Sequence, residues 1–363
     1  MWYKIKPLDT LFFRDGRPFT MGSETWANPI FPPYPSTVYG AIRTWLIFEK
    51  GSLKEFKEGK FKEELGTPSE KGNLKIKGPF ICLDNNIYFP VPFDFLKKKD
   101  AAEEKKLFYV NRINKPEIFI SDYSLERILV NRNDFELEEC DGFLDISSLK
   151  DYLIQRNGIL QFTEKKEIFL EEKKTGIKRS RKTLSSEEGH IYRIPMIRLE
   201  RKAKLFVEID GLSRYPKEGL LQIGGEGKTA KIEKIENDPL MTLIDIDFKF
   251  ENKVFKLYLA TLAIFKKGWL PDWINDTTFE GNYEEIKLKL IACSIGKYNL
   301  IGGWDLANKR PKPMYKAVPP GSVYYFKILD DTPAEKIKEV FHLKNISDIN
   351  LEEGFGLSFI GEV

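Results

Sequence analysis

The sequence has little of the residues that build metal centres and disulfide frameworks. It contains three cysteines and two histidines in 363 residues. Cys82, Cys140 and Cys293 lie far apart, and neither His190 nor His342 stands at a metal-ligand spacing from any of them. This spacing predicts no zinc site and no disulfide framework, and we expect neither a metal nor a cofactor.

Long apolar runs are also missing. Nowhere do about 18 apolar residues follow one another, as a membrane-spanning helix requires. The first residues, MWYKIKPLDTLFF, lack an uninterrupted apolar segment and a small-residue cleavage site. With 31% charged residues and a mean hydropathy of -0.37, the composition is typical of soluble proteins. We therefore expect a cytoplasmic protein.

Charge of one sign is not in large excess. The sequence has 58 basic and 55 acidic residues, for a net charge of +3. Any nucleic-acid surface must therefore arise from local segregation of charge. Such segregation occurs in KKTGIKRSRK, residues 173–182, where six of ten residues are basic and none is acidic. We expect this run to form a loop with Gly176 at its turn.

Apolar residues, at 42% with 13% aromatic, are abundant enough to fill two cores. Helical spacing predicts a helix that ends near Gly51, after a cap at Ser36 or Thr37, and a second one from Pro333. Segments 49–77 and 97–106 are Lys/Glu-rich and are interpreted as surface insertions. Alternation predicts strands at 205–209, 220–223, 229–235 and 286–293, whereas 255–265 fits a strand or a buried helix equally well. The order favours an α+β fold with antiparallel sheets, in two domains at 1–200 and 201–363.

The segment LQIGGEGKTA superficially resembles a phosphate-binding P-loop. Gly227, Lys228 and Thr229 match the end of that motif, but Gln222 stands where its first glycine is required. Residues 229–235 alternate between apolar and polar, which predicts a strand and not the helix that a P-loop needs. We therefore interpret the segment as a β-hairpin and not as an NTPase site.

Two further segments invite a catalytic interpretation. Gly302-Gly303-Trp304-Asp305 resembles the turn of nucleotide cyclases and polymerases, but Trp304 takes the place of a metal-binding acid. His190, near Tyr192 and Arg193, could serve a metal-free ribonuclease as a general base. It is the one suitably placed histidine, so we expect no catalytic site and keep the ribonuclease as the alternative.

The closing GFGLSFIG contains Gly354, Gly356 and Gly361. A dinucleotide-binding turn has to open a helix, whereas this bend leads into a predicted strand. The glycines then serve either tight packing in a core or the close approach of another backbone, such as RNA. In the same way, the cations of the basic run, of the GGEGK hairpin and of NKRPK (residues 308–312) fit either phosphate contacts or a solvated surface.

Several long motifs together resemble a known family. They are PLDTLFFRDGRPFTMG, FPPYPSTVYGAIRTWL, LQIGGEGKTA, GGWDLANKRPKPMYKAVPPGSVYYF and GFGLSFIGEV. The chain resembles, along nearly its whole length, the third subunits of the Cmr complex, the type III-B CRISPR effector, within the RAMP superfamily. The resemblance implies two ferredoxin-like, RRM-related domains with insertions, and a non-catalytic scaffold subunit.

The resemblance also implies partners. They are the 5′ handle of crRNA, a large polymerase/cyclase-like subunit and the backbone RAMP subunits, all acting in antiviral RNA silencing. Exposed aromatics in FKKGWLPDW (residues 265–273) and near Phe31 and Tyr34 would mark partner interfaces, with core packing as the alternative. The residues that we expect to contact RNA are cations and glycines of these motifs: Arg14, Arg17, Arg43, Lys178, Arg179, Arg181, Lys182, Arg193, Gly224, Gly225, Lys228, Lys309, Arg310, Gly354 and Gly356.

Overall fold

A computed structural model describes most of the chain: residues 1–14, 29–100, 104–117, 119, 121–154, 159–179, 182–183, 185–305 and 310–363. Its contacts define two compact units, each assembled from three segments. Unit 1 contains Met1–Asp84, Lys166–Glu236 and Leu300–Tyr315, and unit 2 contains Asn85–Lys165, Asn237–Asn299 and Lys316–Val363. The units therefore interleave along the sequence.

The core of unit 1 is an antiparallel sheet. Its strands lie side by side in the order β2, β14, β1, β16 and β15. Their inward side chains alternate with exposed ones, so that Tyr3 and Ile5 of β1 are fully buried. The strands span Trp2–Pro7 (β1), Lys75–Leu83 (β2), Ala203–Asp210 (β14), Glu218–Gln222 (β15) and Thr229–Ile235 (β16).

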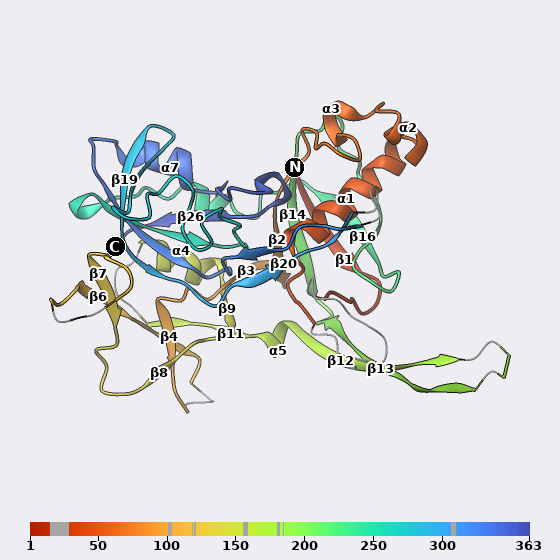
Figure 1. Ribbon diagram of the computed structural model, residues 1–363, viewed down its shortest axis with the longest axis horizontal. Helices are drawn as coiled ribbons and strands as arrows, with labels where there is room; N and C mark the ends of the chain where they lie inside the picture. The colour runs from red at the N-terminus through yellow and green to blue at the C-terminus, as the bar shows by residue number, and fades with distance from the viewer. Residues whose placement is uncertain are drawn as a thin grey trace. The chain divides into compact units, whose positions relative to one another are not determined.

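Helix α1, Pro35–Lys50, packs against this sheet (Figure 1). Trp45 contacts Tyr3 with 6.0 Å between ring centroids, and a Cβ on Gly219 of β15 would lie only 2.1 Å from the Trp45 Nε1. Proline at the first helical position fixes φ for the helix. Tyr34 occupies the N-cap, and its side chain makes no hydrogen bond to the first turn of the helix, so the cap that we predicted at Ser36 or Thr37 is wrong.

The charged insertion at 49–77 folds onto α1 as two short helices, α2 (Leu53–Lys57) and α3 (Lys62–Leu65). Ser52 and Glu55 form a capping box, each side chain accepting from the other residue's backbone N–H. Phe56 and Leu65 are buried. Phe56 and Leu65 therefore anchor this Lys/Glu-rich segment, and most of its charged side chains are exposed.

A long two-stranded ribbon completes unit 1 (Figure 1). Strands β12, Phe169–Arg179, and β13, Ser186–Leu199, pair antiparallel from Phe169 and Leu199 outward. The chain after β1 reaches this ribbon, because Leu11 and Ile197 exchange backbone hydrogen bonds of 2.8 Å. The short strands β21 (Trp304–Asp305) and β22 (Arg310–Pro311) also pair.

Unit 2 contains a six-stranded antiparallel sheet. Its order is β18, β19, β24, β17, β26 and β25. Helices α4 (Ile146–Ile154) and α7 (Ala334–Phe341) both contact β26, and Ile337 and Phe341 of α7 are fully buried. The strands span Val254–Leu259 (β17), Glu280–Tyr283 (β18), Ile286–Ser294 (β19), Val323–Ile328 (β24), Lys344–Asn345 (β25) and Leu357–Gly361 (β26).

Unit 2 also contains further strands. Strands β11 (Thr163–Glu164), β9 (Gly142–Asp145) and β3 (Asn86–Pro90) lie in this order. A second group has the order β10, β5, β4 and β8, and a third is the hairpin β6–β7. These strands span Phe95–Lys98 (β4), Lys106–Tyr109 (β5), Asn111–Asn114 (β6), Arg127–Val130 (β7), Leu137–Glu138 (β8) and Ile159–Gln161 (β10).

Short elements connect these groups. They are α5 (Lys165–Ile168), α6 (Met241–Ile244), the 3₁₀ turns η1 (Glu251–Lys253) and η2 (Leu351–Glu353), and the strands β20 (Asn299–Ile301) and β23 (Tyr315–Ala317). Helix α5, β20 and β23 lie where the chain passes from one unit to the other. Within the described part of the chain, no helix is both long and apolar enough to cross a membrane.

The α+β class with antiparallel sheets is confirmed, but the predicted domain division is not what the contacts define. Residues 203–235 complete the sheet of unit 1, because β14 pairs with β1 on one side and with β2 on the other. Residues 85–165 belong to unit 2. A linear division at residues 200 and 201 therefore separates strands that share one sheet.

A buried polar cluster lies inside unit 2. Asp94 is fully buried and accepts hydrogen bonds from the hydroxyls of Tyr152, at 3.0 and 3.1 Å, and Tyr325, at 2.5 Å. Lys256 of β17 is buried nearby and donates to the Tyr152 carbonyl oxygen at 2.6 Å. Burial lowers the pKa of Lys256 to about 8, although the charge of Asp94 acts in the opposite direction.

This pKa predicts a stability that rises with pH. Between pH 8 and 10, Lys256 has lost its proton in the folded chain but keeps it in the unfolded chain. The free energy of unfolding of wild type, relative to Lys256→Met, should therefore increase by about 1.4 kcal/mol per pH unit in this window. Urea unfolding of both proteins measures this difference. The pKa values of the Cys140 and Cys293 thiols are raised in both proteins, so their contributions to the pH dependence cancel. A flat difference would contradict the prediction.

Candidate nucleic-acid interface

The GGEGK segment is a hairpin turn, as the sequence predicted. Gln222 of β15 pairs with Thr229 of β16, and the Ile223 N–H donates to the Lys228 carbonyl oxygen at 2.9 Å. Gly224 and Gly227 have φ of +75° and +63°, values that favour glycine. A strand follows Thr229, so the segment has no helix N-terminus with which to form a P-loop.

The glycines of this turn lie against the chain's own backbone. The Gly225 N–H donates to the Phe12 carbonyl oxygen at 2.9 Å. A Cβ on Gly224 would lie 2.4 Å from that oxygen, and one on Gly225 would lie 2.8 Å from the Phe12 ring. We predicted that RNA makes the close approach to these two glycines. The structure instead fills that space with Phe12, because the chain after β1 folds back over the hairpin.

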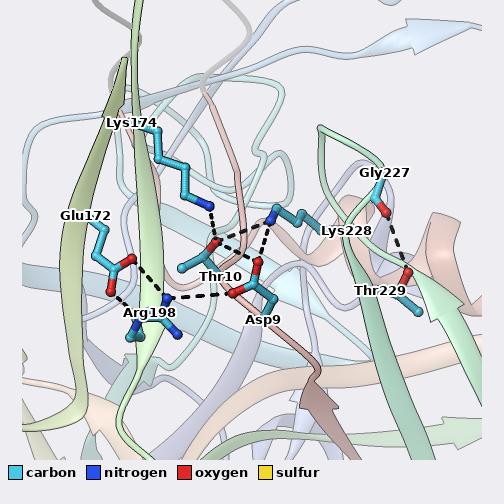
Figure 2. A network of polar contacts seen from close by, with 8 residues as sticks. All are labelled: Asp9, Thr10, Glu172, Lys174, Arg198, Gly227, Lys228 and Thr229. Atoms are coloured by element: carbon cyan, nitrogen blue, oxygen red, sulfur yellow. Dashed lines mark hydrogen bonds and ion pairs between the residues drawn. The ribbon is translucent and has the colours of Figure 1, made fainter. Parts of the chain in front are cut away.

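Lys228 belongs to a polar network around the same stretch of chain (Figure 2). Its Nζ lies 2.9 Å from the Asp9 Oδ2 and 3.3 Å from the Thr10 Oγ1. Lys174 of β12 reaches the same Thr10 Oγ1 at 3.2 Å from its own Nζ. Two ammonium groups thus converge on one buried hydroxyl.

Arg198 of β13 adds a third cation. Its guanidinium makes a bidentate contact with Glu172 of β12 and lies 3.6 Å from the Asp9 carboxylate. The hydrogen bond from Lys228 lowers the pKa of Asp9 to about 2, so this carboxylate is ionised at neutral pH. We call this set the Asp9 cluster; it contains Asp9, Thr10, Glu172, Lys174, Arg198 and Lys228.

Comparison with known proteins identifies the family. The model of the CRISPR-associated protein family Cas_Cmr3 matches residues 3–363. The chain belongs to this family. The curated relative "CRISPR system CMR subunit Cmr3" of Saccharolobus solfataricus is 23% identical over 336 residues, which cover 90% of this chain and 86% of the relative. The resemblance found in the sequence is therefore confirmed.

Two solved structures share the fold of the Cas_Cmr3 chain. One is a subunit of a type III-B Cmr-beta complex bound to cognate target RNA, with a TM-score of 0.53. The other is from the same kind of complex with AMPPnP, in its state 1, with a TM-score of 0.51. Each is 17% identical and covers 90% of this chain and 86% of its own. At this identity the likeness concerns the fold.

The basic run of the Cas_Cmr3 chain lies along the far end of the ribbon. Gly176 lies within β12, where it pairs with Tyr192 of β13, so the turn that we predicted at Gly176 is wrong. Strand β12 continues to Arg179, which pairs with Ser186 of β13. Lys182 follows in the turn and is exposed. The backbones of Lys178, Arg179 and Arg193 lie in the ribbon, but their side chains, and the whole of Arg181, lie outside the described residues.

Arg43 has a role inside the protein. Its Nε donates to the Leu65 carbonyl oxygen at 2.7 Å, and its Nη2 donates to that of Thr67 at 2.6 Å. The guanidinium also lies 5.0 Å above the centre of the Phe56 ring. We predicted an RNA contact for Arg43, but these bonds fasten the insertion to α1. A guanidinium carries five donors, and backbone carbonyls accept at least two of these.

Gly354 and Gly356 also act inside the protein. Both are buried, with φ of +96° and +74°. The Gly356 N–H donates to the Leu262 carbonyl oxygen at 2.6 Å, and a Cβ there would lie 2.5 Å from the Ser347 nitrogen. Of the two functions that the sequence left open, core packing is the one the structure supports. We predicted RNA contacts for both glycines. The structure instead places the Ser347 backbone next to Gly356.

The remaining predicted contacts are at the surface or beyond the described residues. Arg14 is exposed and its backbone forms a bridge with Pro29, and Arg310 is exposed on β22. Arg17 and Lys309 lie outside the described residues. The structure therefore does not gather all the predicted cations into one site.

The aromatic segments that we predicted as partner interfaces are largely packed. The Trp273 ring lies 5.4 Å from that of Phe326, and the Trp269 ring lies 5.1 Å from that of Tyr123. Phe31 packs on Phe169, with 4.6 Å between centroids. These contacts favour the core-packing alternative.

The described residues do not form a cluster of metal ligands. Among them, no group of three or more His, Cys, Asp or Glu is placed to hold a metal ion. Trp304 is 56% exposed on β21. The backbone of His190 lies in β13, but its side chain is not among the described parts of the structure. Its role as a general base therefore stays a prediction.

Proposed function

We propose that this protein is a non-catalytic scaffold subunit of a type III-B CRISPR effector complex in the cytoplasm. It binds the 5′ handle of crRNA and docks the large polymerase/cyclase-like subunit beside the backbone RAMP subunits, in antiviral RNA silencing. The family match over residues 3–363 is the observation that carries this proposal. The curated relative named as a CMR subunit supports it.

The strand order of both units supports an RNA-binding fold. In unit 1, the four strands of the sheet core lie in the order β16, β1, β14, β2, which is fourth, first, third and second along the chain. In unit 2, the strands β26, β17, β24 and β19 repeat this order. We propose that both units are ferredoxin-like, α1 being the first helix of one and α7 the second helix of the other. RRM-related sheets of this type bind single-stranded RNA.

The charge distribution of the ribbon supports contact with phosphates. Lys178 and Arg179 end β12, and Lys182 follows in the turn. Cations at the end of a long hairpin can reach a nucleic-acid backbone without sequence preference. The ribbon is therefore the element that we assign to the RNA backbone.

A salt titration tests this assignment. Replacing Lys178, Arg179, Arg181 and Lys182 by alanine should weaken binding of handle RNA and of unrelated single strands alike. Each lost phosphate contact should reduce the slope of log K against log salt by about 0.7. The matched control removes the same charge from the insertion helices of unit 1, by alanine at the exposed residues Lys54, Lys57, Lys60 and Lys62.

Each outcome of the titration has one meaning. Equal losses in the two fourfold variants would make the effect one of net charge, and an unchanged affinity and slope would remove the ribbon from the RNA site.

Metal-free cleavage of the RNA that disappears with His190→Ala would replace the scaffold proposal by the alternative, a RAMP-type endoribonuclease that processes repeat RNA.

A further inference from the structure

We propose that the Asp9 cluster is a phosphate-binding site in which the Asp9 carboxylate holds the ligand position until a phosphodiester of bound RNA replaces it. The inference rests on the proposed RNA-binding function and adds to it a specific site and a built-in competitor. It assigns Asp9, Thr10 and Lys174 to RNA binding. In this proposal, Lys228 pairs with Asp9 in the free protein and with an RNA phosphate in the complex.

The cations of the site are held close together before any ligand binds. The Nζ atoms of Lys228 and Lys174 lie 3.3 and 3.2 Å from one hydroxyl, that of Thr10. A neutral hydroxyl accepts hydrogen bonds but does not balance two positive charges. Two ammonium groups in this arrangement repel each other unless an anion lies between or beside them. Asp9 is the anion that the chain itself supplies.

The carboxylate is more accessible than the main cation. The Asp9 side chain is 53% exposed, whereas that of Lys228 is 15% exposed. Lys228 lies in the β15–β16 turn, where its carbonyl oxygen accepts from the Ile223 N–H, and Lys174 lies within β12. Asp9 lies on the connection that leaves β1 (Figure 2), and its exposed side chain is free of the backbone pairing that holds the two lysines. The exchangeable member of the cluster is therefore the anion.

Arg198 and Glu172 explain why only part of the cluster is exchangeable. Their bidentate contact joins β13 to β12, and Arg198 reaches Asp9 only at 3.6 Å. If Asp9 withdraws, Arg198 keeps Glu172 as its partner, whereas Lys228 loses the carboxylate that it contacts. A phosphate group accepts charge-assisted hydrogen bonds from ammonium groups as a carboxylate does. The low pKa of Asp9 means that it competes as a full negative charge.

The test is the affinity of the full-length protein, alone and in the reconstituted complex, for single-stranded RNA of the handle sequence. Asp9→Asn should tighten binding about twofold to fivefold at low salt, the fold-change that corresponds to a surface ion pair. Lys228→Met should weaken binding and lower the salt slope by about 0.7. In the Lys228→Met background, Asp9→Asn should give a smaller gain, because Lys174 is then the one of the two ammonium groups that remains.

Asp84→Asn is the matched control. Asp84 also belongs to unit 1, is 56% exposed and pairs with one lysine, Lys202, at 2.8 Å. An equal gain from Asp84→Asn would make the effect one of net charge and would overturn the site. Unchanged or weaker binding by Asp9→Asn, with unfolding like wild type, would make the cluster purely structural. If wild type binds no handle RNA in either form, the proposed function fails and the site fails with it.

Discussion

Asp94→Ala is expected to lower the free energy of unfolding of unit 2 by about 3–5 kcal/mol. Asp94 is fully buried and accepts from the hydroxyls of Tyr152 and Tyr325. Alanine leaves both hydroxyls without this acceptor inside the core. It also leaves the buried ammonium of Lys256 without the opposite charge that favours its protonated form.

The two contributions can be separated by a second variant. Asp94→Asn removes the charge and replaces one acceptor oxygen by an amide NH2 but keeps the other oxygen, so we expect a smaller loss than with alanine. Asp331→Ala is the matched control, because this fully exposed carboxylate of unit 2 also neighbours a lysine, Lys253. It should change the free energy of unfolding by no more than about 1 kcal/mol. Urea unfolding followed by far-UV circular dichroism measures all three, and a loss below that value for Asp94→Ala would contradict the prediction.

Gly356→Val is expected to destabilise unit 2 by about 3 kcal/mol. Part of this loss is backbone strain, because a side chain at φ of +74° costs about 1–2 kcal/mol. The rest is overpacking, because the added Cβ would lie 2.5 Å from the Ser347 backbone nitrogen. The same urea unfolding experiment measures the total loss.

Gly268→Val isolates the strain. Gly268 also lies in unit 2 and has φ of +78°, but a Cβ there meets nothing within 4 Å. The difference between the two variants is therefore the packing contribution of the Ser347 contact. If instead Gly356→Val unfolds like Gly268→Val but binds handle RNA more weakly, the original prediction of an RNA contact at Gly356 would be restored.

The sequence predicted those elements whose signal is local. The hairpin around GGEGK follows from a glycine turn between two alternating segments, and α1 follows from helical spacing after a proline-rich stretch. The strand at 229–235 is observed with the same bounds. Hydrogen bonds and side-chain alternation within about ten residues decide these elements, so one sequence is enough to find them.

The partners of the predicted residues could not be found in the same way. Lys228 and Asp9 are separated by 219 positions, and no local pattern connects them. A glycine needed by RNA and a glycine needed by Phe12 have the same sequence signature, since both need only the missing Cβ. Arg43 illustrates the same limit, because a cation that binds backbone carbonyls has the composition of one that binds phosphates.

The interleaving of the two units governs how the chain can fold as it leaves the ribosome. Strand β1 emerges long before both of its neighbours, β14 and β16, which are encoded beyond residue 200. The sheet of unit 2 likewise waits for β26, at residues 357–361. Vectorial, domain-by-domain folding is thus closed to this chain, and β1 spends most of translation as an unpaired strand. A nascent chain stalled at residue 200 would hold neither finished sheet.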